Sequence, residues 1–148
     1  MLAVERNDPL QLKQEEGGGV QMADTHASKG QIPAEKMGDY EGRMQQFGDY
    51  YVNFETMPAG TGGPEIFKGL PDDACQSEHW GYVFKGKVSF RYTDGSEDIV
   101  SAGEAYYCRP GHVFEALEDT ETVEFSPKEE FDKTLEVAGK NLADMDQS

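Results

Sequence analysis

The sequence predicts an all-β fold, an antiparallel sandwich or barrel that carries one helix at its C-terminal end. Three observations lead to this prediction. Short segments with alternating apolar and polar residues follow one another over residues 49–125, and alternation is the periodicity of a strand. Glycine-rich turns separate them at intervals of roughly 8 to 12 residues, as in sandwiches and barrels. After residue 125 the apolar residues change to helical spacing.

The first 45 residues are predicted to form a flexible N-terminal arm. They contain the run Gly17–Gly19, few β-branched residues and many glutamine, lysine and acidic residues. Such a composition buries little apolar surface, and glycine runs behave as flexible linkers. We expect residues 1–45 to be loose, or to pack across the domain or onto a second subunit.

Residues 46–127 form the predicted β domain. Residues 57–68 are rich in glycine and proline and are expected to be a loop. Asp94-Gly95 is a hairpin signal, and Ala102-Gly103 predicts another turn. Strands are expected over residues 51–56, 82–84, 88–93, 98–100, 105–108, 112–117 and 120–125.

The last segment, residues 128–148, is predicted to be a helix of three or four turns and a short tail. Residues 126–129 read Ser-Pro-Lys-Glu, a capping box with proline at the first helical position. Four apolar residues then share one helical face, which we expect to pack against the sheet. They are Phe131, Leu135, Ala138 and Leu142.

Composition excludes several classes of partner. The 148 residues carry 13 basic and 29 acidic side chains, a net charge of −16, so phosphates of nucleic acid would be repelled. An anionic membrane surface is excluded for the same reason. No apolar run approaches the roughly 20 residues that span a bilayer, and residues 1–10 lack an apolar signal-peptide core. We therefore expect a cytoplasmic protein.

One group of residues offers metal-binding chemistry. The segment of residues 72–80 contains Asp73, Cys75 and His79, and His112 follows in a later predicted strand. Residues two or four apart in a strand share a face. Thiolate, imidazole and carboxylate are ligands of zinc and of other first-row metals. The alternative is structural, because isolated histidines and cysteines are often buried core residues.

The sequence resembles the cupin family over about residues 49–127. The resemblance lies in residues 79–86 (HWGYVFKG), the turn Asp94-Gly95 and residues 102–112 (AGEAYYCRPGH). Residues 69–73 (GLPDD) also match a subgroup of small single-domain cupins. The resemblance implies a jelly-roll barrel (a double-stranded β-helix) whose motif residues bind a metal inside it.

The first cupin motif ends in a glycine that aligns with Gly86. Counting back from it places His79 at the family's glutamate position, Cys75 at its second histidine and Asp73 at its first. The resemblance therefore implies a changed ligand set in which all three residues can still bind a metal.

The second motif aligns Gly103 and Gly111 with two family glycines, while Arg109 replaces a proline. The family's histidine position falls on Phe114, and His112 lies two residues earlier. A two-residue step along a strand keeps the same face, so the fourth implied ligand is His112.

Four further residues are candidates for a pocket, namely Trp80, Tyr107, Phe114 and Glu124. The three aromatic residues have core packing as their alternative interpretation. Glu124 interrupts an apolar strand: facing inward it would be a proton-transfer group or metal neighbour, and facing outward only a surface charge.

These features lead to a functional hypothesis: a metal-dependent enzyme acting on a small molecule. The soft ligand set favours zinc among the divalent transition metals, and non-redox chemistry over oxygenation. The alternatives are a ligand- or metal-binding barrel without turnover and a metal-free barrel. The resemblance also implies a homodimer, formed through barrel edges or an exchanged N-terminal strand.

Overall fold

The computed structural model describes residues 25–146, which form nine strands, three short 3-10 helices and one α-helix. The 3-10 helices are η1 (Lys29–Gln31), η2 (Pro64–Phe67) and η3 (Pro71–Asp73), and the α-helix is α1 (Lys128–Asp146). The strands are β1 (Glu35–Met37), β2 (Tyr40–Phe47), β3 (Tyr50–Met57), β4 (His79–Lys85), β5 (Lys87–Tyr92), β6 (Glu97–Ser101), β7 (Ala105–Cys108), β8 (His112–Ala116) and β9 (Thr120–Pro127).

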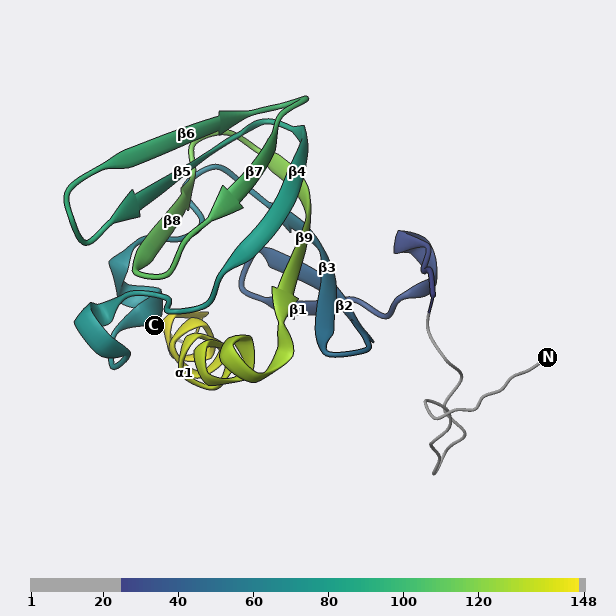
Figure 1. Cartoon of the computed structure of the whole chain (residues 1–148), viewed down its shortest axis with the longest axis horizontal. Helices are drawn as coiled ribbons and strands as arrows, with labels where there is room; N and C mark the ends of the chain where they lie inside the picture. Colours follow the sequence, from purple (N-terminus) through teal and green to yellow (C-terminus); the bar gives the residue numbers. More distant parts are fainter. Residues whose placement is uncertain (1–24, 147–148) are drawn as a thin grey trace.

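The strands form two antiparallel sheets. The larger has the order β1-β2-β3-β9-β4-β7, and the smaller has the order β6-β5-β8. Every neighbouring pair within them is antiparallel. In Figure 1 the smaller sheet lies opposite the β4–β7 end of the larger one, and α1 lies below both. A mostly antiparallel β fold with a C-terminal helix is thus confirmed.

The core lies where the inner faces of the two sheets meet. Its buried residues come from β4, β5, β6 and β7, where alternate residues of a strand point to one face. They are Val83, Val88, Phe90, Tyr92, Val100 and Cys108. A second apolar cluster joins η2 to α1 through Ile66, Phe67, Cys75 and Ala138.

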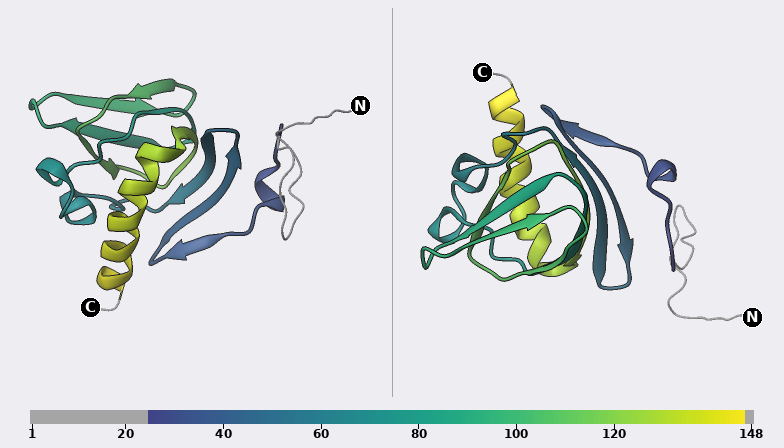
Figure 2. Two further views of the ribbon diagram at one scale, coloured as in Figure 1. Left: turned by 60° about the horizontal axis from the view of Figure 1, so that its bottom comes forward. Right: turned by 90° about the horizontal axis from the view of Figure 1, so that it is seen from above.

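Helix α1 covers one open end of the two sheets, beside the turns at residues 64–73 (Figure 2). Its 19 residues make about five turns, against the three or four predicted. The predicted apolar face does turn inward: Phe131 and Ala138 are buried, and Leu135 and Leu142 are half-buried. No helix in residues 25–146 is long and apolar enough to cross a membrane.

The predicted capping box does not form. Ser126 and Pro127 belong to β9, and the Ser126 hydroxyl is hydrogen-bonded to a ring nitrogen of His79 at 2.7 Å. The first backbone N–H of the helix, on Lys128, donates to the Asp49 carbonyl instead. The tertiary partner therefore overrides the local helix signal.

The prediction of a loose arm is wrong for residues 35–45. These residues lie in β1 and β2, so the predicted boundary at residue 46 falls inside a strand. β2 pairs with β3 over seven residue pairs, and this pairing outweighs its poor strand composition. The missed signal is the two-residue turn Gly48-Asp49, in which Gly48 has φ of +59°. The rest of the arm before residue 25, including Gly17–Gly19, lies outside the described residues.

Candidate metal centre

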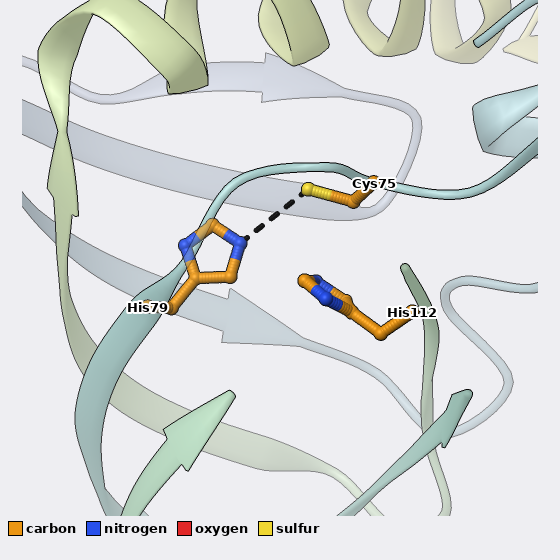
Figure 3. Close-up of side chains that lie close together, drawn as sticks. All are labelled: Cys75, His79 and His112. Atoms are coloured by element: carbon orange, nitrogen blue, oxygen red, sulfur yellow. Dashed lines mark hydrogen bonds between the residues drawn. The ribbon is translucent and has the colours of Figure 1, made fainter. Parts of the chain in front are cut away.

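Three predicted ligands meet between the two sheets (Figure 3). Cys75 lies in the segment before β4, His79 begins β4, and His112 begins β8. A β-bridge joins Cys75 to His112, with the Cys75 N–H donating to the His112 carbonyl at 2.8 Å. One donor atom from each side chain lies within 4.8 Å of the other two, and all three residues are buried.

The spacing of these donors fits a tetrahedral metal ion. The Cys75 Sγ atom is 3.5 Å from His79 Nε2. Typical zinc–sulfur and zinc–nitrogen bond lengths put two such ligands about 3.6 Å apart at a tetrahedral angle. The two imidazole rings have centroids 5.0 Å apart and meet edge to face. Three buried donors converge as a metal site requires.

Hydrogen bonds to the outer nitrogens orient both imidazoles. His112 Nδ1 is 2.8 Å from the Arg109 carbonyl oxygen, which can only accept, so Nδ1 carries the proton and Nε2 keeps its lone pair. His79 Nδ1 faces the Ser126 hydroxyl at 2.7 Å and Glu124 Oε1 at 3.3 Å, which leaves Nε2 for the cluster. Metal-binding histidines typically have such partners.

Burial sets the charge states of the three donors. Removal from water lowers the pKa of His79 to about 3, and burial together with the neighbouring His79 lowers the pKa of His112 to about 3. Burial raises the pKa of the Cys75 thiol to about 11. At neutral pH the imidazoles are therefore in the neutral form that binds metals, while the thiol must lose its proton.

Asp73, the fourth residue of the predicted cluster, is not brought to the other three. Its side chain is exposed, and its carboxylate accepts a hydrogen bond from the Gly69 N–H at 3.0 Å. The two-residue spacing between Asp73 and Cys75 predicted a shared strand face. Residues 71–73 instead form η3, in which Asp72 and Asp73 have positive φ, so strand alternation does not apply.

A cavity of about 130 Å³ adjoins the three donors. Of the four predicted pocket residues, Phe114 and Glu124 line it. Trp80 and Tyr107 do not; they are 39% and 47% exposed, with ring centroids 5.4 Å apart. Because His79 points inward on β4, its neighbour Trp80 must point outward, and Tyr107 is its partner on β7.

The cavity contains a polar layer of which the sequence analysis predicted Glu124 but missed Glu55 and Asn53. Glu124 accepts a hydrogen bond from the Tyr106 hydroxyl at 2.7 Å. Glu55 accepts one from Tyr40 at 2.7 Å and one from Thr122 at 3.1 Å. Burial raises the pKa of Glu124 to about 7, while burial and the charge of Glu124 raise that of Glu55 to about 8. Two carboxyl groups thus lie inside the fold, near a candidate metal site.

Gly81 makes the approach of Tyr106 possible. It pairs with Tyr106 on β7 and with Glu124 on β9, so all three face the same side. A Cβ atom at Gly81 would overlap the Tyr106 ring. The missing side chain lets the ring cross β4 and place its hydroxyl on Glu124.

The thiols show no disulfide. Cys75 and Cys108 are both buried and free. Cys108 lies in the core between the sheets, where the Tyr92 hydroxyl donates to its sulfur at 3.7 Å. Cys75 alone faces the two histidines, so it is the thiol available as a ligand.

The fold of this chain is similar to those of several solved structures. No protein-family model matches the sequence, and no curated protein matches it. An RmlC-like cupin from Shewanella frigidimarina superposes with a TM-score of 0.54 at 17% identity, over 72% of this chain and 95% of its own.

Two structures of enzymes are similar to the same extent. Ectoine synthase from P. lautus has a TM-score of 0.55 and 12% identity, over 71% of this chain and 78% of its own. The polyketide cyclase RemF from Streptomyces resistomycificus has a TM-score of 0.52 and 16% identity, over 71% and 80%. With its two antiparallel sheets and inward-facing histidines, the chain has the cupin fold.

Proposed function

We propose that the chain is a metal-dependent enzyme that acts on a small molecule inside a jelly-roll barrel. One observation carries this proposal: three buried donors, Cys75, His79 and His112, lie on the wall of a cavity that also contains the buried carboxyl group of Glu124 and the half-buried one of Glu55. Three protein ligands leave one position of a tetrahedral ion open, as in catalytic rather than structural sites. Two similar structures are named as enzymes, a synthase and a cyclase.

The ligand types favour zinc and non-redox chemistry. A thiolate with two imidazoles suits zinc better than magnesium or calcium. When bound, such an ion supplies Lewis acidity towards an oxygen atom of the substrate or of water. The chain itself supplies the apolar walls that exclude water, and the Phe114 and Phe90 rings belong to these walls.

Proton transfer is assigned to Glu124. Its Oε1 atom is 3.3 Å from His79 Nδ1, and its Oε2 atom accepts the hydrogen bond of Tyr106. Burial raises the pKa of its carboxyl group to about 7, and a general acid or base works best when its pKa lies near the operating pH. Glu124 can therefore hold a proton at one step and release it at another.

Metal content tests the proposal directly. Protein purified without an affinity tag should contain about one equivalent of zinc or another transition metal by plasma mass spectrometry. Cys75→Ala and His79→Ala should each lose it, because each removes one of three ligands. Cys108→Ala, which removes the buried thiol outside the cluster, should retain it. A folded wild-type protein without metal would contradict the proposal and favour a binding barrel without turnover.

We also propose a homodimer that forms through the outer face of the larger sheet. Six aromatic side chains from β3, β4, β7 and β9 are 38% to 54% exposed. Such rings bury up to about 200 Å² each, so the exposed part of the six rings amounts to about 500 Å². This is more than half of the roughly 800 Å² per partner that a standard interface buries, and the surrounding residues would supply the rest. The six residues are Tyr50, Trp80, Tyr82, Phe84, Tyr107 and Phe125.

The dimer predicts a specific loss of self-association. Phe84→Glu should weaken dimerisation at least 100-fold in sedimentation velocity, because the symmetry of the dimer places the new charge on both copies. Ile99→Glu on β6 of the smaller sheet is the matched control, since Ile99 is 53% exposed and Phe84 54%. A monomeric wild-type protein, or equal effects of both substitutions, would contradict this interface.

A further inference from the structure

The cavity next to the candidate metal site is acidic and lacks a counter-charge. Glu55 and Glu124 lie inside it, and exposed Glu35 on β1 also lines it. No lysine or arginine among the described residues lines this cavity. The hydrogen bonds to Glu55 come from the neutral groups of Tyr40, Asn53 and Thr122. A buried carboxylate is stable only when a positive charge or enough hydrogen bonds compensate it.

Asn53 supplies an independent sign of a missing ligand. It is 3% exposed, lines the cavity, and has an Oδ1 atom without a hydrogen-bond partner among the described residues. Its amide orientation is fixed because Nδ2 donates to the Tyr40 hydroxyl at 3.1 Å and approaches Glu55 Oε2 at 3.4 Å. With Glu55 ionised, turning the amide would bring Oδ1 against Glu55 Oε2 and against the Tyr40 hydroxyl, whose proton is donated to Glu55. Oδ1 is therefore a buried acceptor that lacks a donor.

The register of the larger sheet brings these acceptors together. Asn53 on β3 is the direct partner of Glu124 on β9, and direct partners have Cβ atoms about 5 Å apart. Glu55 follows two residues after Asn53 and shares its face. Gly42 on β2 leaves the neighbouring space open, because a Cβ atom there would lie 3.3 Å from Asn53 Oδ1.

We propose that this end of the cavity binds the ammonium group of a small aliphatic amine, between Glu55, Glu124 and Asn53 Oδ1. An ammonium group has three donors and a positive charge, which matches one unpaired acceptor and two carboxyl groups. The raised pKa of Glu55, about 8, fits a site that lacks its cation. An anion or phosphate would instead meet two carboxyl groups and no basic side chain.

The rest of the cavity sets the size of the amine. Met44, Met57 and Phe90 line it and suit an aliphatic chain. Its volume of about 130 Å³ is close to that of an engineered cavity of about 150 Å³ that binds benzene. The ligand therefore has about six non-hydrogen atoms. This inference names a substrate class and so rests on the proposed enzyme, although the amine site itself does not require the metal.

Three probes of equal length separate charge from shape: n-propylammonium, 1-propanol and propionate. Each is titrated into the full ¹⁵N-labelled chain, as purified and after chelation, and Kd is obtained from the amide shifts of residues 53–55. The ammonium should bind at least tenfold more tightly than the alcohol, and propionate should not bind. Glu55→Gln should weaken ammonium binding at least tenfold and leave propanol binding unchanged. Glu129→Gln, exposed on α1, is the charge-matched control.

The outcomes separate the amine site from the metal site. Equal binding of the three probes, or full ammonium affinity in Glu55→Gln, would overturn the inference. Gly42→Ala gives a second test, because its methyl group would crowd Asn53 Oδ1 and should also weaken ammonium binding. If ammonium binds to a chain that never takes up metal, the amine site stands and the enzyme proposal fails. If the chain takes up metal but does not bind ammonium, the enzyme proposal stands and the amine site fails.

Discussion

Zinc should bind about tenfold more tightly for each unit of pH between pH 6 and pH 8. Burial lowers the pKa of His79 and of His112 to about 3, so both imidazoles are already neutral over this range. Burial raises the pKa of Cys75 to about 11, so its thiol still holds a proton. Metal binding must therefore release one proton from the three ligands, and a one-proton release changes the association constant tenfold per pH unit.

Competition with a chromophoric chelator at pH 6, 7 and 8 measures this slope, once the chelator's own protonation is corrected. Wild-type protein should show a roughly 100-fold gain in affinity across the range, by the same proton balance. Cys75→Ala should bind more weakly and lose the slope, because only neutral imidazoles remain. Cys108→Ala should keep the full slope, since this thiol lies in the core. A flat wild-type profile would exclude the Cys75 thiolate as a ligand.

The sequence predicted the fold best where strand alternation and turn chemistry agreed. The predicted strand at residues 105–108 coincides with β7, and that at 88–93 overlaps β5 at 87–92. β2 was missed because its sequence lacks β-branched residues, and a strand of this kind depends on pairing with a strong neighbour. That pairing with β3 is a tertiary contact, which periodicity within one segment cannot reveal.

The candidate site was predictable by residue type but not by backbone path. Cys75 and His112 meet across a β-bridge, and His79 begins β4 four residues after Cys75, so the two sheets bring all three side chains together. Asp73 has a suitable side chain, but η3 turns the chain away before residue 75. The local signal for this 3-10 turn was Pro71-Asp72-Asp73, since proline and aspartate favour turns over strands.

Of the polar layer in the cavity, Glu124 was predicted, but Asn53 and Glu55 were missed for a different reason. On β3, Asn53 and Glu55 alternate with Val52 and Phe54, which normally means polar side chains outward and apolar side chains inward. Here Asn53 and Glu55 face the cavity, while Val52 is buried on the opposite face. Alternation determines that two faces differ, but not which face is internal. Because the cavity is polar, the polar face of β3 is the internal one, which is the reverse of the usual arrangement.

Glu55 should make the stability of the folded chain depend on pH. Burial and the charge of Glu124 raise the pKa of Glu55 to about 8 in the folded chain, against roughly 4.3 for an unperturbed glutamate. Between these values the folded state binds more protons than the unfolded state. The free energy of unfolding must then fall as pH rises through this window. Glu55 is therefore neutral to stability at low pH and destabilising near pH 8.

Glu55→Gln should accordingly stabilise the chain at pH 8 by roughly 3 kcal/mol more than at pH 5, from the linkage between pKa and stability. The glutamine keeps the shape and can still accept from Tyr40 and Thr122, as Glu55 does, but it cannot ionise. Urea unfolding of both proteins at pH 5 and pH 8 measures the difference. Glu129→Gln, an exposed charge on α1, corrects for the change in net charge. If Glu55→Gln and Glu129→Gln shift stability equally at both pH values, then the pKa of Glu55 is not raised in the folded chain, and the cavity does not need a cation.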